Sequence, residues 1–122
     1  MIIGVGIDII EIERIKEAME NESLLGRIFT PAEIKYFERR KYNPSTIAGS
    51  FASKEALVKA LGTGIGKVSW HDIEVLRCTK GRPYIKLYGE AKKVFMSFNG
   101  ERIHVSISHN RKDAIAQVIL EG

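Results

Sequence analysis

The segment at residues 46–61 is the feature that most constrains how this chain can fold. It predicts an uninterrupted helix, with Gly49 as its only weak point and Gly62 as an ordinary C-terminal cap. Apolar residues occupy nearly the whole circumference of this helix, so we expect it to be buried. The chain can build the core that a buried helix needs, because 44% of its 122 residues are apolar and 28% are charged. Its length suits a single domain over residues 1–122.

Strand and helix patterns fill most of the remaining sequence. Alternating apolar and β-branched residues predict strands at 1–10, 72–78, 83–88, 102–109 and 114–120, the first of them in the interior of a sheet. Helical spacing predicts further helices at 12–25, from 31 to the basic run at 39–41, and at 89–98. The second of these has a clear start signal, with Thr30 as its N-terminal cap, Pro31 at the first position and Glu33 at the third. This order of elements indicates an α+β fold, with helices packed on a mainly antiparallel sheet.

Asp8 is a carboxylate within a strand that otherwise has the pattern of a buried one. The apolar residues of this strand lie on one face, and Gly4, Gly6 and Asp8 lie on the other, where missing side chains let another group approach closely. An unpaired carboxylate in such a place is costly, so Asp8 needs a cation, a metal ion or backbone donors. The alternative is an Asp at the strand end that caps the helix starting near Ile12.

Glu55 and Lys59 are four residues apart and therefore share one face of the central helix. The small residues Ala48, Ala52 and Ala56 lie beside them, which suggests room for a ligand. The alternative is an ordinary surface salt bridge. Asp8 and Glu55 together would suit a hard cation such as Mg²⁺, which binds few protein ligands and keeps water or phosphate oxygens.

Two other patterns carry weaker signals. The glycine-rich run GTGIGK at 62–67 can offer backbone N–H groups to phosphate, but Leu61 and Val68 break the standard phosphate-loop template. The alternative is a flexible turn that ends the helix. His104, Ser106 and Ser108 alternate on one strand face, which is often only the solvent face.

Composition and charge exclude several classes of protein. No apolar run has the length of a membrane span, and Asp8 and Glu11 interrupt the apolar N-terminal stretch, so we expect a cytoplasmic protein without a signal peptide. The single cysteine, Cys78, excludes an internal disulfide. A net charge of +4 favours an anionic partner. An RNA-binding domain is one alternative, although the aromatic residues are not interleaved with basic ones as a stacking surface requires.

Five segments, taken together, resemble the holo-acyl-carrier-protein synthase family, the short bacterial phosphopantetheinyl transferases. They are GIDI at 6–9, FTPAE at 29–33, FASKEALVKALGTG at 51–64, GRP at 81–83 and VSISH at 105–109. The match runs over essentially the whole chain in the right order, and the central segment is long and specific.

The resemblance implies transfer of the phosphopantetheine arm of coenzyme A to a serine of apo acyl carrier protein, with Mg²⁺ and release of adenosine 3′,5′-bisphosphate. Asp8 and Glu55 would bind the metal, Lys59 would lie at the phosphates and His104 near the pyrophosphate. Arg14 would meet acidic residues of the carrier. The coenzyme A site would be lined by the turn Gly62, Thr63, Gly64 and by the region Gly81, Arg82, Pro83. Family members are homotrimers with sites between subunits.

Three points stay open at this stage. The base that takes the serine proton is either a water ordered by the metal and Glu55, or His104. Ser50 stands where the family has Arg, so one contact to the 3′-phosphate of coenzyme A is missing unless Arg39, Arg40 or Lys41 replaces it. The last alternative is a relative that binds coenzyme A or the carrier without catalysis. The presence of both predicted metal ligands, Asp8 and Glu55, argues against it.

Overall fold

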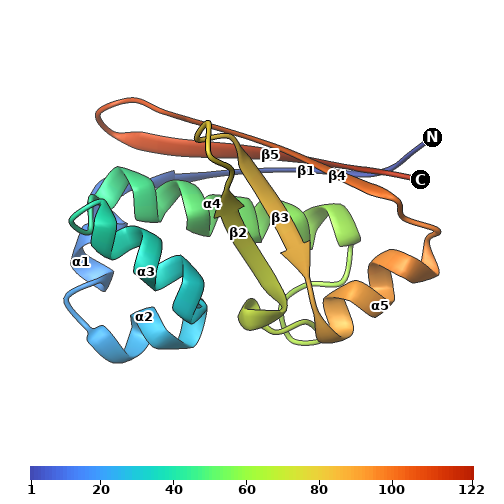
Figure 1. The fold of residues 1–122 in the computed structure, drawn as a ribbon, viewed down its shortest axis with the longest axis horizontal. Helices are drawn as coiled ribbons and strands as arrows, with labels where there is room; N and C mark the ends of the chain where they lie inside the picture. The colour runs from blue at the N-terminus through green and yellow to red at the C-terminus, as the bar shows by residue number, and fades with distance from the viewer.

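Helix α4 (Pro44–Leu61) lies along one face of a three-stranded antiparallel sheet (Figure 1). In this sheet β5 (Asp113–Glu121) is central and pairs with β1 (Ile2–Glu11) on one side and β4 (Arg102–His109) on the other. The computed structural model describes residues 1–122. The predicted α+β class, with helices on an antiparallel sheet, is confirmed.

Strand β1 is an edge strand, so the prediction that it lies in the interior of the sheet is wrong. Its glycine-bearing face packs on α4, whereas Val5, Ile7 and Ile9 point the other way and are 54%, 53% and 62% exposed. Alternation marks the two faces of a strand but does not say which face is covered. The apolar face of β1 is therefore open in the single chain.

Glycines in β1 let the strand lie directly against α4. A Cβ atom on Gly6 would overlap the backbone of Ala56 and Ala60, and one on Gly4 would overlap the carbonyl of Ala60. The alanines of α4, including Ala52 and Ala56, are fully buried in this packing. The predicted room for a ligand among the alanines is therefore absent, because the sheet itself fills it.

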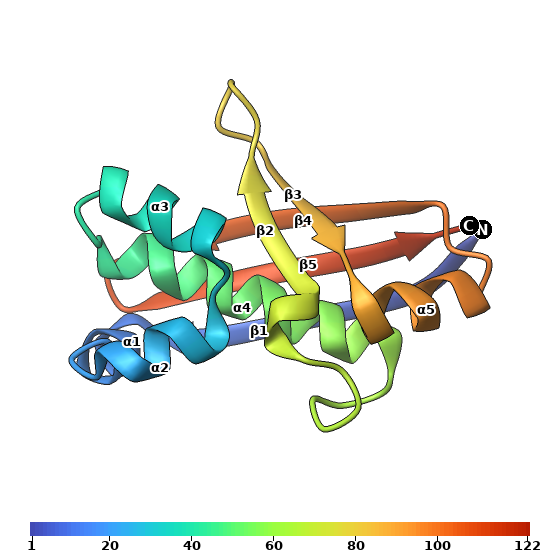
Figure 2. The same ribbon diagram turned by 60° about the horizontal axis from the view of Figure 1, so that its bottom comes forward.

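Short helices cover one end of α4 (Figure 2). The predicted helix at 12–25 is in fact two helices, α1 (Ile12–Ala18) and α2 (Glu22–Ile28), because the side chain of Asn21 caps a new start by accepting a hydrogen bond from the Ser23 amide. Helix α3 (Pro31–Arg39) begins with the predicted Thr30 cap, and Glu33 completes a capping box. These helices pack around Phe29 and Phe37 in a second, smaller core, to which α4 and β5 also contribute.

A hairpin covers the other half of α4. It consists of β2 (Ile73–Arg77) and β3 (Pro83–Leu87), follows the short helix η1 (Trp70–Asp72) and leads into α5 (Gly89–Ser97). The two chain ends lie side by side, since the amino group of Met1 donates to the carbonyl of Gly122 over 2.6 Å (Figure 2). No helix is both long and apolar enough to cross a membrane.

Candidate active site

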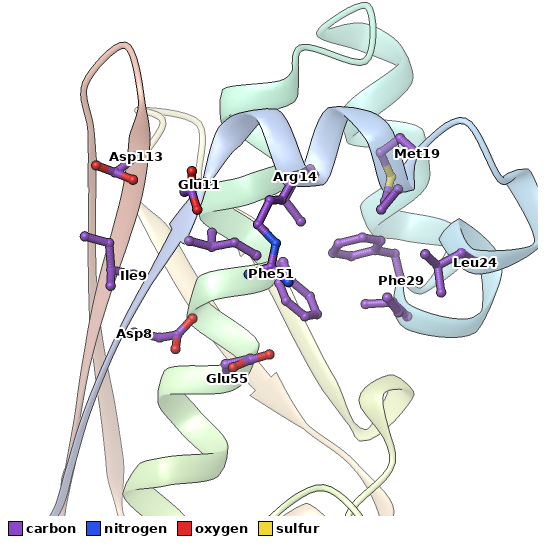
Figure 3. Close-up of a pocket in the computed structure, with 14 residues that line it drawn as sticks. Asp8, Ile9, Glu11, Arg14, Met19, Leu24, Phe29, Phe51, Glu55 and Asp113 are labelled. Atoms are coloured by element: carbon purple, nitrogen blue, oxygen red, sulfur yellow. The ribbon is translucent and has the colours of Figure 1, made fainter.

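Asp8 and Glu55 come from distant parts of the sequence and meet between β1 and α4. Their side chains lie next to one another (Figure 3), and the side chain of Asp8 is only 11% exposed. Burial raises the pKa of Glu55, and the nearby charge of Asp8 raises it further. Two carboxylates that lie close together in a half-buried place favour a cation between them.

Lys59 completes this cluster, but with a different partner from the one that its spacing predicts. Its ammonium group donates to Asp8 Oδ1 over 3.1 Å and to the carbonyl of Ile7 over 3.0 Å. Glu55 forms no salt bridge with Lys59, so the simple surface pair considered from the sequence is not formed. The Lys59 side chain remains 55% exposed and free to approach a bound anion.

Two cavities border Glu55. The main cavity, of about 540 Å³, has Asp8, Glu55, Arg14 and Phe51 at one end and apolar residues that include Leu24 and Phe29 at the other (Figure 3). The side cavity, of about 240 Å³, is lined by Glu55, Val58, Lys59, Ile65 and Trp70. Glu55 thus stands at the boundary between two open spaces.

The donor set suits a hard divalent cation that keeps most of its coordination for other ligands. No group of three or more His, Cys, Asp or Glu side chains is placed to enclose a metal ion. Asp8 and Glu55 are the two carboxylates of this cavity that lie close enough to repel one another, and their repulsion is relieved when a cation binds. Mg²⁺ accepts such a pair, because it is usually bound by one or two carboxylates together with water and substrate phosphates.

The remaining residues from the sequence prediction lie elsewhere in the chain. His104 is on the outward face of β4, where its Nε2 is 2.9 Å from Glu121 Oε1. Together with Arg82 and Pro83 it lines an outer cavity of about 440 Å³ that shares no residue with the other two. The turn at 62–64 follows α4 and lines none of these three cavities.

Sequence patterns missed a buried ion pair behind the site. Lys54 and Glu33 are both 0% exposed and lie 2.7 Å apart. Burial lowers the pKa of Lys54 and raises that of Glu33, while their attraction opposes both shifts. The only sequence signal for Lys54 is a charged residue within an otherwise apolar helix.

A second missed feature is a group of arginines around one ring. The guanidinium carbons of Arg39, Arg40 and Arg77 lie 5.8, 5.9 and 5.6 Å from the centre of the Tyr36 ring. None of the three forms a salt bridge with a carboxylate. Burial and the charge of Arg40 lower the pKa of Arg77.

Comparison with known proteins decides the family. A sequence model of the 4′-phosphopantetheinyl transferase superfamily matches residues 4–118. The chain belongs to this superfamily. It is an enzyme of the holo-[acyl-carrier-protein] synthase family: the synthase of Clostridium tetani is 51% identical over 123 residues, covering 100% of this chain and 98% of that protein. The synthase of Alkaliphilus metalliredigens is 52% identical over 120 residues, covering 98% of each chain.

Solved structures of phosphopantetheinyl transferases share the fold of this one. The holo-[acyl-carrier-protein] synthase of Neisseria meningitidis has a TM-score of 0.91 at 32% identity and covers 100% of both chains. The Helicobacter pylori synthase, solved in complex with coenzyme A, has a TM-score of 0.84 at 38% identity and covers 96% of this chain and 99% of that one.

Proposed function

We propose that this phosphopantetheinyl transferase moves the 4′-phosphopantetheine arm of coenzyme A to a serine of apo acyl carrier protein, in the cytoplasm. The reaction needs Mg²⁺ and releases adenosine 3′,5′-bisphosphate. The observation that carries the proposal is the meeting of Asp8 and Glu55 at the mouth of the main cavity, with Lys59 on Asp8. The synthases of known structure that bind coenzyme A support the substrate.

Asp8 and Glu55 would hold the metal ion in this reaction. When bound, Mg²⁺ polarises the attacked phosphorus and neutralises part of the charge on the pyrophosphate. Lys59 lies on the same cluster with an exposed ammonium group, so it can balance the charge that develops on the leaving phosphate.

Glu55 is better placed than His104 to receive the serine proton. Its carboxylate borders the cavity that Asp8 and Arg14 also line, so it is within reach of a substrate bound there. His104 lines a different cavity of the same chain and is already hydrogen-bonded to Glu121. We assign the base to Glu55, directly or through an ordered water, because the His104 side chain that a neighbouring subunit would bring is already engaged with Glu121.

A homotrimer would complete the site. The open apolar face of β1 with Val5, Ile7 and Ile9 needs cover, and a subunit packed there brings parts of two chains together. The residues predicted for the site are divided within one chain between the Asp8 cluster and the outer cavity of Arg82 and His104. We infer that one subunit supplies the first set and its neighbour supplies the second.

The arginines around Tyr36 would replace the contact that is lost at Ser50. Ser50 is 2% exposed and cannot reach a ligand as a long basic side chain could. Arg40 and Arg77 have no carboxylate partner, and crowded guanidinium groups attract a dianionic phosphate. We assign them to the 3′-phosphate of coenzyme A.

In the decisive experiment the protein is incubated with coenzyme A, Mg²⁺ and apo acyl carrier protein. The mass of the carrier protein is then measured by mass spectrometry. A gain of one phosphopantetheine, abolished by EDTA and restored by Mg²⁺, supports the proposal. Asp8→Asn and Glu55→Gln should remove this activity while the circular dichroism spectrum stays unchanged. No gain in mass, combined with tight binding to RNA, would instead favour a basic binding domain.

A further inference from the structure

The buried pair of Glu33 and Lys54 has no part in the proposed reaction, yet it lies directly behind the site. Lys54 precedes Glu55 in α4, and its ammonium group is enclosed by protein. The side chain runs between α3 and α4 to reach Glu33, over 2.7 Å, and lies 5.2 Å from the centre of the Phe29 ring. The ammonium group of Lys54 is thus fixed on one side of α4, and Glu55 extends from the next residue of the same helix.

Lys54 also binds the walls of both cavities that border Glu55. Its ammonium donates to the carbonyl of Ile28 over 2.7 Å and to the carbonyl of Trp70 over 3.0 Å. Ile28 lines the main cavity and Trp70 lines the side cavity. One buried cation therefore joins α4 to a wall of each space.

Glu33 holds Lys54 in place through a network in which every buried polar side-chain atom has a hydrogen-bond partner. Its Oε1 atom accepts from the Thr30 amide and its Oε2 atom accepts from the Val75 amide, each over 2.8 Å. No buried side-chain nitrogen or oxygen in the structure lacks a hydrogen-bond partner. The network joins α2, α3, α4, η1 and β2 around two charges.

Stability alone does not explain such a pair. Charges lose their hydration when they are buried, and a well-packed apolar pair of the same volume is often equally stable or more so. What the ion pair provides, and an apolar pair would not, is direction, because each hydrogen bond fixes an angle as well as a distance.

We propose that Lys54, held by Glu33, is a positioning residue that orients Glu55 and sets the spacing of the two cavity walls. Successive residues of an α-helix are about 100° apart around its axis, so anchoring α4 through Lys54 fixes the direction in which Glu55 leaves the helix. The inference rests on the proposed function, since it is the metal-binding and proton-accepting role of Glu55 that requires a fixed orientation.

The test replaces both charges with neutral side chains of similar length, in the variant Glu33→Gln/Lys54→Met, which leaves no buried charge unpaired. The matched control is Phe95→Leu, a core substitution in α5 that touches none of the three cavities. Each protein is assayed well below its melting temperature for kcat and for the KM of Mg²⁺ and of coenzyme A. Trp70 is the single tryptophan and lines the side cavity, so its fluorescence emission detects a change in the position of that cavity wall.

We expect the double variant to lower kcat about tenfold or more, to raise the KM for Mg²⁺, and to shift the emission of Trp70 to longer wavelength. The control should keep all three kinetic constants within about twofold and the emission unchanged, although its melting temperature falls. A folded double variant with wild-type kinetics overturns the inference, whatever its fluorescence.

A single variant keeps the test decisive if the double variant does not fold. Glu33→Gln retains the length of the side chain and an oxygen that accepts from Lys54, so it should raise the KM for Mg²⁺ by a smaller factor. Unchanged kinetics in a folded Glu33→Gln protein overturn the inference. If the wild-type protein itself shows no Mg²⁺-dependent transfer, the proposed function fails. The fluorescence of Trp70 then still tests whether the Glu33–Lys54 pair fixes the wall of the side cavity.

Discussion

Replacing Gly6 with alanine is the sharpest test of how the fold creates the site. Gly6 lies two residues before Asp8 on the face of β1 that packs against α4. An added Cβ would come within 2.8 Å of the Ala60 nitrogen and 2.9 Å of the Ala56 carbonyl carbon, and it would overlap the Ala56 carbonyl oxygen. All these atoms belong to the backbone, so no change of side-chain rotamer relieves the overlap.

The size of the effect follows from these distances. Ordinary van der Waals contact begins at 3.4 Å, so β1 and α4 have to separate by at least roughly half an ångström at this point, and by more at the carbonyl oxygen. Overpacking of this kind costs about 1–3 kcal/mol or more. The same movement separates Asp8 from Glu55, and a misplacement of about 1 Å at a catalytic centre can cost about a hundredfold in rate.

The measurement compares Gly6→Ala with Gly26→Ala in urea unfolding and in the carrier-modification assay. Gly26 lies in α2, where an added Cβ meets nothing within 4 Å, so its alanine variant should be about 0.5–1 kcal/mol more stable than wild type and fully active. Gly6→Ala should lose stability and raise the KM for Mg²⁺. A Gly6→Ala protein as stable and active as wild type would refute the close packing of β1 on α4.

Three further predictions concern the proposed ligands and partners. Arg77→Ala should raise the KM for coenzyme A several-fold but leave that for dephospho-coenzyme A, which lacks the 3′-phosphate, within about twofold; an equal effect on both would contradict the assignment. Ile7→Asp should convert the proposed trimer to monomers in sedimentation experiments, with loss of activity, and an active monomer would refute a site between subunits. Arg14→Ala should raise the KM for the carrier protein, and this KM should then increase less steeply with salt concentration than in wild type. An unchanged salt dependence would exclude Arg14 from carrier binding.

Local signals in the sequence were sufficient for most elements. The Thr30 cap followed by Pro31 and Glu33 predicted the start of α3, and the structure confirms the complete capping box. Gly62 ends α4 in the left-handed conformation, with a φ of 77°, as its C-terminal position predicted. These features depend only on neighbouring residues, so the sequence alone is enough to recognise them.

Features that depend on the order of strands were not accessible in the same way. The alternation in β1 predicted a strand correctly, but an edge position with an open apolar face depends on the pairing of β5 between β1 and β4. The break between α1 and α2 was missed because the apolar spacing continues across Asn21, and the cap outweighs that spacing.

Charge partners within the segment SKEALVK show most clearly what spacing cannot provide. Two lysines flank Glu55, and the interval of four residues favours a pair between Glu55 and Lys59. In the folded chain each lysine instead binds a carboxylate from a distant segment: Lys54 binds Glu33, and Lys59 binds Asp8. Glu55 is thereby left without a salt bridge, next to a second carboxylate and at the border of two cavities, which leaves its oxygens available for the metal-binding role that we propose.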